Sequence, residues 1–307
     1  MSTPHSQRKH SSETARNGLL STGLAFTLWG LLPVYWKLLD TVPAFQILSH
    51  RTIWSLVFLF ILLLLFKRLG EVKKALRSRR NRWCLAGGSL MLAANWGIYI
   101  WAVTNGHIIE ASLGYYITPL VNVILGCLVF KDRLKPLQLG AIALALVGVT
   151  VMVVRYGHFP WLALSIALSF GLYGMIRKLA DVESLPGLFL ETTILSPFMA
   201  AFLLWQEHQG LGAFLHSSLS VDGLLILSGV ATSVPLLLFA HGARRISFIT
   251  VGLLQYITPT LTFLLGCLVY GEEFRPSHVL GFTCIWLALA LYTFDGLRRY
   301  RYSFKNS

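Results

Sequence analysis

The chain has 307 residues, of which 55% are hydrophobic and 13% are charged, and its formal net charge at pH 7 is +13. The mean hydropathy of +0.64 excludes an ordinary soluble protein, whose surface has to face water. The composition therefore predicts a protein that lives in a lipid bilayer.

Ten apolar segments of membrane-spanning length follow one another along the chain. They cover residues 18–39, 44–66, 83–103, 108–130, 136–154, 159–178, 187–206, 222–240, 248–270 and 277–295. Each is close to the roughly 20 residues that a helix needs to cross about 30 Å of hydrocarbon. Backbone polar groups in hydrocarbon must be hydrogen-bonded within the protein, and these long runs lack the alternation of barrel strands. The sequence therefore predicts an all-α polytopic membrane protein with ten transmembrane helices.

The placement of the basic residues predicts the orientation of the chain. If the N-terminus is cytoplasmic, 22 of the 26 Lys and Arg residues lie in cytoplasmic segments, and eight of these lie in residues 67–82. This follows the positive-inside rule and places both tails, 1–17 and 298–307, in the cytoplasm. The expected partner of the positive charge is the lipid bilayer and not a nucleic acid. The first apolar segment is longer than a signal-peptide core and lacks a convincing cleavage site, so it is expected to stay.

An internal duplication links the two halves of the chain. Residues 116–136 and 256–276 are identical at 10 of 21 positions. The shared residues that hydropathy does not explain are Tyr116, Thr118, Pro119, Gly126, Cys127 and Pro136, which recur as Tyr256, Thr258, Pro259, Gly266, Cys267 and Pro276. Because each half holds an odd number of spans, the second copy must enter the membrane from the opposite side. The sequence therefore predicts a 5+5 inverted repeat, with one copy at 18–154 and the other at 155–297.

Pro119 and Pro259 each fall near the middle of a predicted span. Proline removes one backbone donor and clashes with the carbonyl group four residues back. Two interpretations stay open: either Thr118 and Thr258 buffer simple kinks, or both helix breaks line a central substrate cavity. Inverted repeats of this kind support alternating access.

Three ionisable side chains are predicted inside spans, where insertion scales give a cost of roughly 2.5–3.5 kcal/mol. Arg51 and Glu110 share a leaflet and could pair, and a structural ion pair is as good an interpretation as a substrate clamp. Glu191 could pair with Arg177 or Lys178. It would then either bridge helices or take part in transport.

Polar and aromatic residues surround these charges. They are Trp29, Tyr35, Gln46, His50, Asn95, Trp96, Tyr99, Trp101, Tyr115, Asn122, Tyr173, Gln255 and Tyr256. Asn95 and Trp96 lie too deep in their span for an interfacial belt. Apolar and aromatic walls with a few polar groups suit a small amphiphilic molecule. His50 could sense protons, although one His beside a cation is more often neutral.

Motifs for catalysis are not found. The chain shows no phosphate loop, acid–base pair, nucleophile set, or haem or flavin motif, so neither an enzyme nor a cofactor is expected. The four cysteines, Cys84, Cys127, Cys267 and Cys284, lie within predicted spans, and neither a disulfide framework nor a metal site is expected from them. The loops leave no room for an ATPase domain, so transport would use gradients or be equilibrative.

Several longer strings resemble a known family. They are HRTIWS at 50–55, NWGIYIWAV at 95–103, EASLGYYITPLVNVILG at 110–126, SFGLYGMIRK at 169–178, VPLLLFA at 234–240 and LQYITPTLTFLLG at 254–266. From about residue 18 to 297 the chain is similar to the RarD group of EamA-type transporters in the drug/metabolite transporter superfamily. The resemblance implies ten helices, two EamA repeats, a bacterial inner-membrane location and a permease named for predicted chloramphenicol resistance.

The family pattern carries over to particular positions of this chain. They are Arg51, Asn95, Trp96, Glu110, Tyr116, Pro119, Asn122, Glu191, Gln255, Tyr256 and Pro259. Thr118 departs from the Asn expected in the first copy of the motif, which puts a shared side-chain contact there in doubt.

Residues and resemblance together predict a secondary transporter of small organic solutes, with export of drugs or metabolites favoured over uptake. Arg51 would hold an anionic or hydroxyl-rich group, and the aromatic side chains would cover the apolar part of the solute. An amino-acid permease is the alternative within transport. A channel or a lipid-handling scaffold is the alternative from a different class. Ion or proton coupling stays open.

Overall fold

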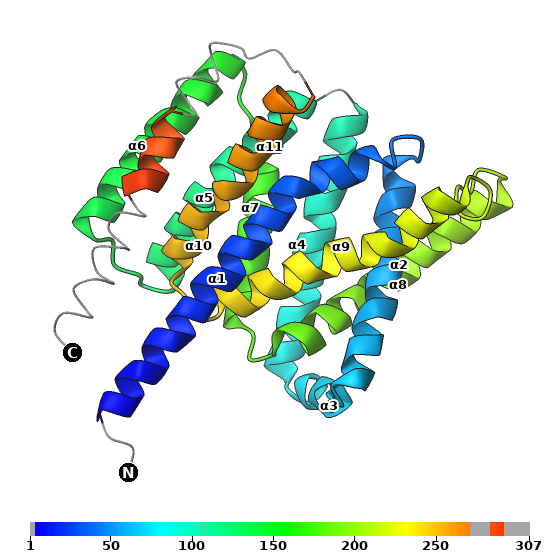
Figure 1. Cartoon of the computed structure of the whole chain (residues 1–307), viewed down its shortest axis with the longest axis horizontal. Helices are drawn as coiled ribbons and strands as arrows, with labels where there is room; N and C mark the ends of the chain where they lie inside the picture. The colour runs from blue at the N-terminus through cyan, green and yellow to red at the C-terminus, as the bar shows by residue number, and fades with distance from the viewer. Residues whose placement is uncertain (1–3, 106, 271–282, 292–307) are drawn as a thin grey trace. The chain divides into compact units, whose positions relative to one another are not determined.

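The computed structural model describes residues 4–105, 107–270 and 283–291, and within these it contains helices and no strands (Figure 1). The helices are α1 Pro4–Lys37, α2 Ala44–Leu65, α3 Leu69–Arg77, α4 Arg79–Thr104, α5 Ile108–Val129, α6 Pro136–Tyr156, α7 Trp161–Leu179, α8 Ser184–His208, α9 Leu219–Ala243, α10 Phe248–Gln255 and α11 Ile257–Leu268. The all-α prediction is confirmed.

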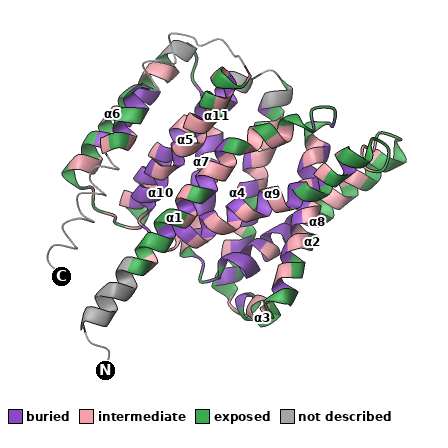
Figure 2. Ribbon diagram, viewed as in Figure 1, coloured by how far each residue is buried: buried purple, intermediate pink, exposed green. Residues whose placement is uncertain are grey.

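In the described part of the chain, nine helical segments are long and apolar enough to cross a membrane. Their exteriors carry large apolar side chains, which include Leu128 at 73% exposure and Leu268 at 78% (Figure 2). Such surfaces suit hydrocarbon and not water. The tenth predicted span, 277–295, lies partly outside the described residues, and residues 283–291 within it are helical. The chain is a polytopic membrane protein.

Two of the segments predicted as non-membrane are helical. The polar start of the chain, expected as a tail over 1–17, belongs to α1 from Pro4 onward. The basic segment 67–82 contains α3, which packs against α8. Arg68 donates two hydrogen bonds of 2.6 Å to the carboxylate of Glu71 at the start of α3, and these bonds hold the pKa of Glu71 below its usual value.

The chain forms two compact units, and the first consists of residues 1–100 and 172–246. In it α2 packs against both α8 and α9, and α1 packs against α9. Gly229 lets α9 approach α2 closely, because a Cβ atom there would lie 2.6 Å from the backbone nitrogen of Ser55. The Ser55 hydroxyl donates to the carbonyl oxygen of Gly229 at 3.0 Å.

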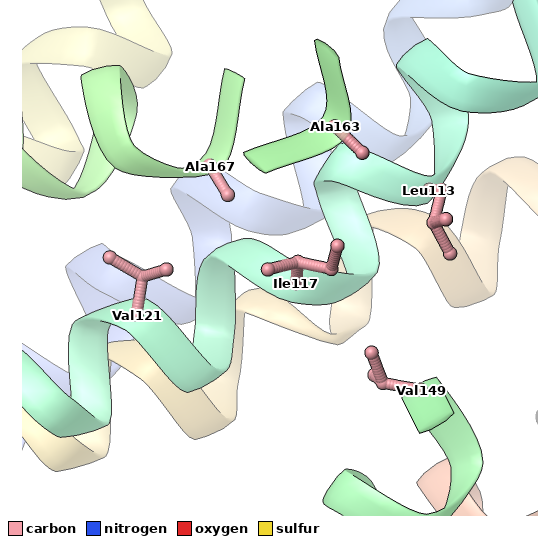
Figure 3. Close-up of a cluster of buried hydrophobic side chains, with 6 residues drawn as sticks. All are labelled: Leu113, Ile117, Val121, Val149, Ala163 and Ala167. Atoms are coloured by element: carbon pink, nitrogen blue, oxygen red, sulfur yellow. The ribbon is translucent and has the colours of Figure 1, made fainter. Parts of the chain in front are cut away.

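The second unit consists of residues 101–171 and 247–307. Within it α5 packs against α6 and α10. The buried core joins α5, α6 and α7 (Figure 3) through Leu113, Ile117, Val121, Val149, Ala163 and Ala167. The two alanines on α7 leave room for the larger side chains of α5.

Each compact unit contains parts of both predicted repeats. Unit 1 takes residues 1–100 from the first half and 172–246 from the second, and unit 2 takes 101–171 and 247–307. The boundaries predicted for the duplication, 18–154 and 155–297, therefore differ from those of the compact units, and they stay a prediction.

The two copies of the YITP motif give different helices. In the first copy α5 runs from Ile108 to Val129 as one helix with Pro119 inside it. The Thr118 hydroxyl donates to the carbonyl oxygen of Gly114 at 2.7 Å, and this local bond accompanies the uninterrupted helix. In the second copy the helix is divided, because α10 ends at Gln255 and α11 begins at Ile257. The interruption falls at Tyr256, three residues before Pro259, where proline cannot donate to a backbone carbonyl.

Candidate functional site

Arg51 of α2 lies between aromatic rings in unit 1. Its guanidinium carbon is 4.3 Å from the ring centroid of Trp96 on α4 and 5.7 Å from that of Trp36 on α1. A guanidinium over an indole face is held by the ring quadrupole, with a contribution of about 0.5–2 kcal/mol. The position of Arg51 in the span is thus fixed by aromatic side chains from two neighbouring helices.

The loop between α8 and α9 packs against α2 through Phe214. Phe214 lies 5.2 Å from the ring of His50 and 5.9 Å from that of Trp54, centroid to centroid. Gln46 holds the loop in place, because its amide donates to the carbonyl oxygen of Leu211 at 2.7 Å and accepts from the nitrogen of Ala213 at 3.0 Å. Phe214 was not predicted, because it lies in the loop between two predicted spans. His50 is 7% exposed, and its proposed proton role stays a prediction.

Asn95 is 9% exposed and directly precedes Trp96 in α4. The predicted set Arg51, Asn95 and Trp96 therefore comes from two helices of one compact unit. Trp36 was absent from the predicted set, because a tryptophan near the end of a span is typical of an interfacial belt.

Glu191 lies in a second buried cluster of unit 1. The structure places Arg177 beside it, at 3.6 Å between Arg177 Nη1 and Glu191 Oε1, and the hydroxyl of Tyr173 donates to Glu191 Oε2 at 3.2 Å. Lys178 points elsewhere, because its ammonium donates to the carbonyl oxygens of Ala243 and Ile246. Of the two partners predicted for Glu191, Arg177 is the one in contact.

In unit 2 the two copies of the repeat motif meet at an amide pair. Asn122 of α5 donates to Gln255 Oε1 of α10 at 2.6 Å, and both side chains are buried. The following residue, Tyr256, is 0% exposed, and its hydroxyl makes no hydrogen bond. Tyr116 is the corresponding tyrosine of the first copy and packs in the same core cluster as Tyr256, whereas Tyr115 is 39% exposed.

Two carboxylates of unit 2 cap helices. Glu110 Oε1 accepts a hydrogen bond of 2.9 Å from the nitrogen of Leu162 in the first turn of α7. Asp132 Oδ2 accepts from the nitrogens of Phe248 and Ile249 at the start of α10, at 2.8 and 3.4 Å. Carboxylates at these positions satisfy free amides and favour the positive end of the helix dipole. Asp132 was not predicted, because it lies among four basic and apolar residues of the KDRLK segment.

Arg51 and Glu110 belong to different compact units. The ion pair expected between them stays a prediction. Glu110 meanwhile has a structural role at the start of α7 that the sequence did not indicate.

A cavity of about 310 Å³ lies in unit 1 at the end of the helices near α3. It is lined by Ser21, Leu62, Phe66, Arg68, Glu183, Ser184, Leu185, Leu237, Leu238 and His241. None of these was in the predicted substrate set. Whether Thr118, Pro119, Thr258 and Pro259 line a cavity stays a prediction.

The part of the chain that the structure describes offers no candidate metal centre. No three His, Cys, Asp or Glu side chains come together in it. The four cysteines are free thiols in this structure.

Comparison with known proteins adds the family. The profile of the EamA-like transporter family matches residues 16–154 and again 160–294. The uncharacterized transporter YojE of Bacillus subtilis is 45% identical over 287 residues, which cover 92% of this chain and 95% of that protein. Protein RarD of Escherichia coli is 38% identical over 286 residues, 93% of this chain and 97% of that one. The chloramphenicol-sensitive protein RarD of Pseudomonas aeruginosa is 33% identical over 290 residues, which cover 92% of this chain and 96% of that protein.

A solved structure titled "Crystal structure of protein" is similar in fold. Its TM-score is 0.68 at 19% sequence identity, and the match covers 92% of this chain and 98% of that chain. At this identity the likeness supports the fold alone.

Proposed function

We propose that this chain, which belongs to the EamA-like transporter family and within it to the RarD group, is a secondary carrier that moves small organic solutes across a bacterial inner membrane. The duplicated sequence supports alternating access, because two inverted copies can exchange conformations. The basic segments support cytoplasmic positions for both termini. Export of a drug or metabolite is the favoured direction.

The arrangement of Arg51 against Trp96 carries the proposal. A guanidinium offers a planar set of donors to a carboxylate, a phosphate or a cluster of hydroxyl groups. The indole rings of Trp36 and Trp96 supply apolar contact area for the rest of a solute. Asn95, which precedes Trp96 in α4, is a further buried amide of the same unit. The site thus favours a solute with one anionic or hydroxyl-rich end and one apolar end.

An amphenicol, which joins hydroxyl groups to an aromatic ring, is one solute of this class. The name of the Pseudomonas aeruginosa relative refers to chloramphenicol sensitivity, which supports including such drugs among the tested solutes. A free amino acid with an apolar side chain is the second candidate, because its carboxylate would suit Arg51.

Counterflow in proteoliposomes tests the proposal. Vesicles that contain the purified protein are preloaded with a pool of amino acids, of amphenicols or of other small metabolites, and uptake of a labelled member is followed. We expect one pool to accelerate uptake in the wild type and Arg51→Ala to abolish the acceleration. Arg77→Ala removes an exposed arginine of α3 and serves as the matched control, with wild-type counterflow expected.

Two results would refute the carrier. One is the absence of counterflow with every pool from protein that is folded by circular dichroism. The other is uptake that rises linearly with solute concentration without saturation, which is the behaviour of a channel. Equal counterflow in Arg51→Ala and the wild type would leave the carrier standing and remove Arg51 from its binding site.

A further inference from the structure

The charged cluster of α7 and α8 has no part in the Arg51 site. Glu191 is 0% exposed and Arg177 is 1% exposed, and both lie in helices of membrane-spanning length. Tyr173, whose hydroxyl donates to Glu191, is also fully buried. Ionisable side chains at such positions are costly and are usually kept for ion or proton movement.

The ion pair in this cluster is poorly hydrogen-bonded. A well-formed Arg–carboxylate pair has contacts of about 2.7–2.9 Å, often two in parallel. Here the closest distance is 3.6 Å, and Glu191 Oε1 as well as Arg177 Nε and Nη1 make no hydrogen bond. Each buried polar atom left in this state costs about 1–3 kcal/mol. Protonation of the carboxylate therefore loses less hydrogen-bond stabilisation here than it would in a well-bonded pair.

Two glycines leave the space that these charged groups occupy. A Cβ atom at Gly88 of α4 would lie 2.9 Å from Glu191 Oε1. A Cβ atom at Gly187 of α8 would overlap the guanidinium of Arg177. The oxygen of Glu191 that lacks a hydrogen bond therefore faces a backbone without a side chain, and a proton can be added to it without a clash.

A cavity adjoins the cluster on the side of Arg177. Ser184 lines the cavity of about 310 Å³, and the carbonyl oxygen of the same residue accepts a hydrogen bond of 3.4 Å from Arg177 Nη2. The hydroxyl of Ser184 is buried and makes no hydrogen bond. Arg68, Glu183 and His241 line the same cavity and are polar groups that water can solvate. Ser184 thus links this cavity to the buried ion pair.

The cluster is also close enough to the Arg51 site to act on it. Gly88 and Trp96 are eight residues apart on the single helix α4, which corresponds to roughly 12 Å along its axis. A movement of α4 against α8 that follows a change of charge at Glu191 would therefore displace Trp96, on which Arg51 rests.

We infer that Glu191 is a proton-binding site, and that it takes up a proton from one side of the membrane and releases it to the other during each transport cycle. The inference rests on the proposed carrier function and assigns the proton gradient as its driving force. The proton adds to Oε1, so that the carboxylate becomes a neutral carboxylic acid and the Arg177 guanidinium loses its counter-charge. Release restores the ion pair.

The ionisable groups around Glu191 are few. Arg177 and Tyr173 of α7 are the groups that act on it electrostatically, and α4 presents Gly88 and Ser89 to it. The other helices that pack on α8 are α2, α3 and α9. Among their described residues the ionisable ones are His50, Arg51, Glu71, Lys73, Lys74, Arg77, Asp222 and His241.

Infrared difference spectra of the purified full-length protein between high and low pH test proton binding without any solute. We expect a carboxylic acid C=O signal that appears on acidification in the wild type and is missing in Glu191→Gln. Glu207→Gln is the matched control on the same helix, because Glu207 is 54% exposed and pairs with His216. If Glu191→Gln does not fold, Tyr173→Phe removes only the hydroxyl hydrogen bond and should shift the pH midpoint of the signal. Identical spectra in the wild type and in the variant that folds would overturn the inference.

Transport in vesicles tests the coupling, with the solute pool that supports counterflow. A difference of one pH unit should drive about a tenfold accumulation if one proton moves per solute. Glu191→Gln should keep counterflow at equal pH and lose this accumulation, and pyranine inside the vesicles should report proton movement in the wild type only. Counterflow without pH-driven accumulation in the wild type would overturn the inference and leave the carrier intact. Absence of counterflow would instead refute the carrier, while the infrared signal decides proton binding separately.

Discussion

Gly252 is the position at which α10 lies closest to α5, and Gly252→Ala should destabilise the protein. An added Cβ atom would lie 2.6 Å from the carbonyl oxygen of Pro119, 3.2 Å from Asn122 Cβ and 3.3 Å from a methyl group of Val123. The first of these neighbours is backbone at a proline inside a continuous helix, so it cannot rotate away. The two helices would have to separate.

The magnitude follows from two opposing effects. Overpacking of a well-packed contact costs about 1–3 kcal/mol. Alanine in a helix interior regains about 0.8–1.0 kcal/mol relative to glycine. Because the closest contact is below 3.0 Å and involves backbone, we expect the upper part of the overpacking range and a net loss of about 1–2 kcal/mol.

Gly140→Ala in α6 is the matched control, because no atom lies within 4 Å of the added Cβ atom. Only the helix preference remains there, and a gain of up to about 1 kcal/mol is expected. The assay is equilibrium unfolding in mixed micelles of dodecylmaltoside with increasing dodecyl sulfate, followed by tryptophan fluorescence. A Gly252→Ala protein as stable as the wild type, alongside a stabilised Gly140→Ala, would refute the packing argument.

Three further predictions concern single side chains. Arg51→Lys keeps the charge but loses the guanidinium group over the ring of Trp96. The half-saturation concentration for the transported solute should therefore rise roughly 2- to 30-fold, which is equivalent to about 0.5–2 kcal/mol. An unchanged half-saturation concentration would contradict a role for this contact. Asp132→Ala removes the cap from the first amides of α10 and should cost about 1 kcal/mol in the micelle assay, whereas Asp132→Asn should keep most of the stability. The pKa of Glu71 is lowered by Arg68, so its contribution to stability is fully present above the unfolded pKa of about 4.3 and is lost as the pH falls through the lower folded pKa. The stability difference between wild type and Glu71→Gln should therefore be constant from pH 7 to 6 and vanish in acid, and a difference that persists in acid would show that the pair is not its source.

Much of the fold could be predicted because the bilayer restricts the choices. Runs of about 20 apolar residues can satisfy their backbone in hydrocarbon only as helices, so composition and length were sufficient for the spans. The helix α3 was missed because four of its nine residues are charged and the basic residues of segment 67–82 were interpreted as a topology signal. Ala75 of α3 is buried against Leu85 and Leu190, and only that tertiary contact distinguishes it from a loop.

The difference between the two YITP motifs could not be read from their sequences. Both contain a proline near the middle of a span, yet α5 continues through Pro119 and the second helix is divided at Tyr256. The four residues YITP are the same in both copies, but Gly114 and Tyr115 precede the first copy and Leu254 and Gln255 precede the second. Tyr256 keeps helical dihedral angles, φ −63° and ψ −13°, so the interruption is local.

The structure brings some of the predicted site residues together, and their role in transport stays a prediction. Arg51 and Trp96 were predicted from burial cost and depth, and the structure brings them together. Trp36, which also lies near Arg51, was left out of the predicted set because a tryptophan near the end of a span is typical of an interfacial belt. The amide pair of unit 2 joins residues 133 positions apart. Residues so far apart in the chain show no periodic pattern that would predict their contact from one sequence.

The composition of the compact units has a consequence for synthesis. Residues 101–171 emerge from the ribosome before the second part of unit 1 is made, so α1 and α2 enter the membrane without α8 and α9, the helices on which they pack. Long-range contacts of this kind form late and slowly. A fragment that ends at residue 154 would contain one full repeat but neither unit complete. Separately expressed halves of this chain should therefore be degraded alone and recovered when both are made in the same cell.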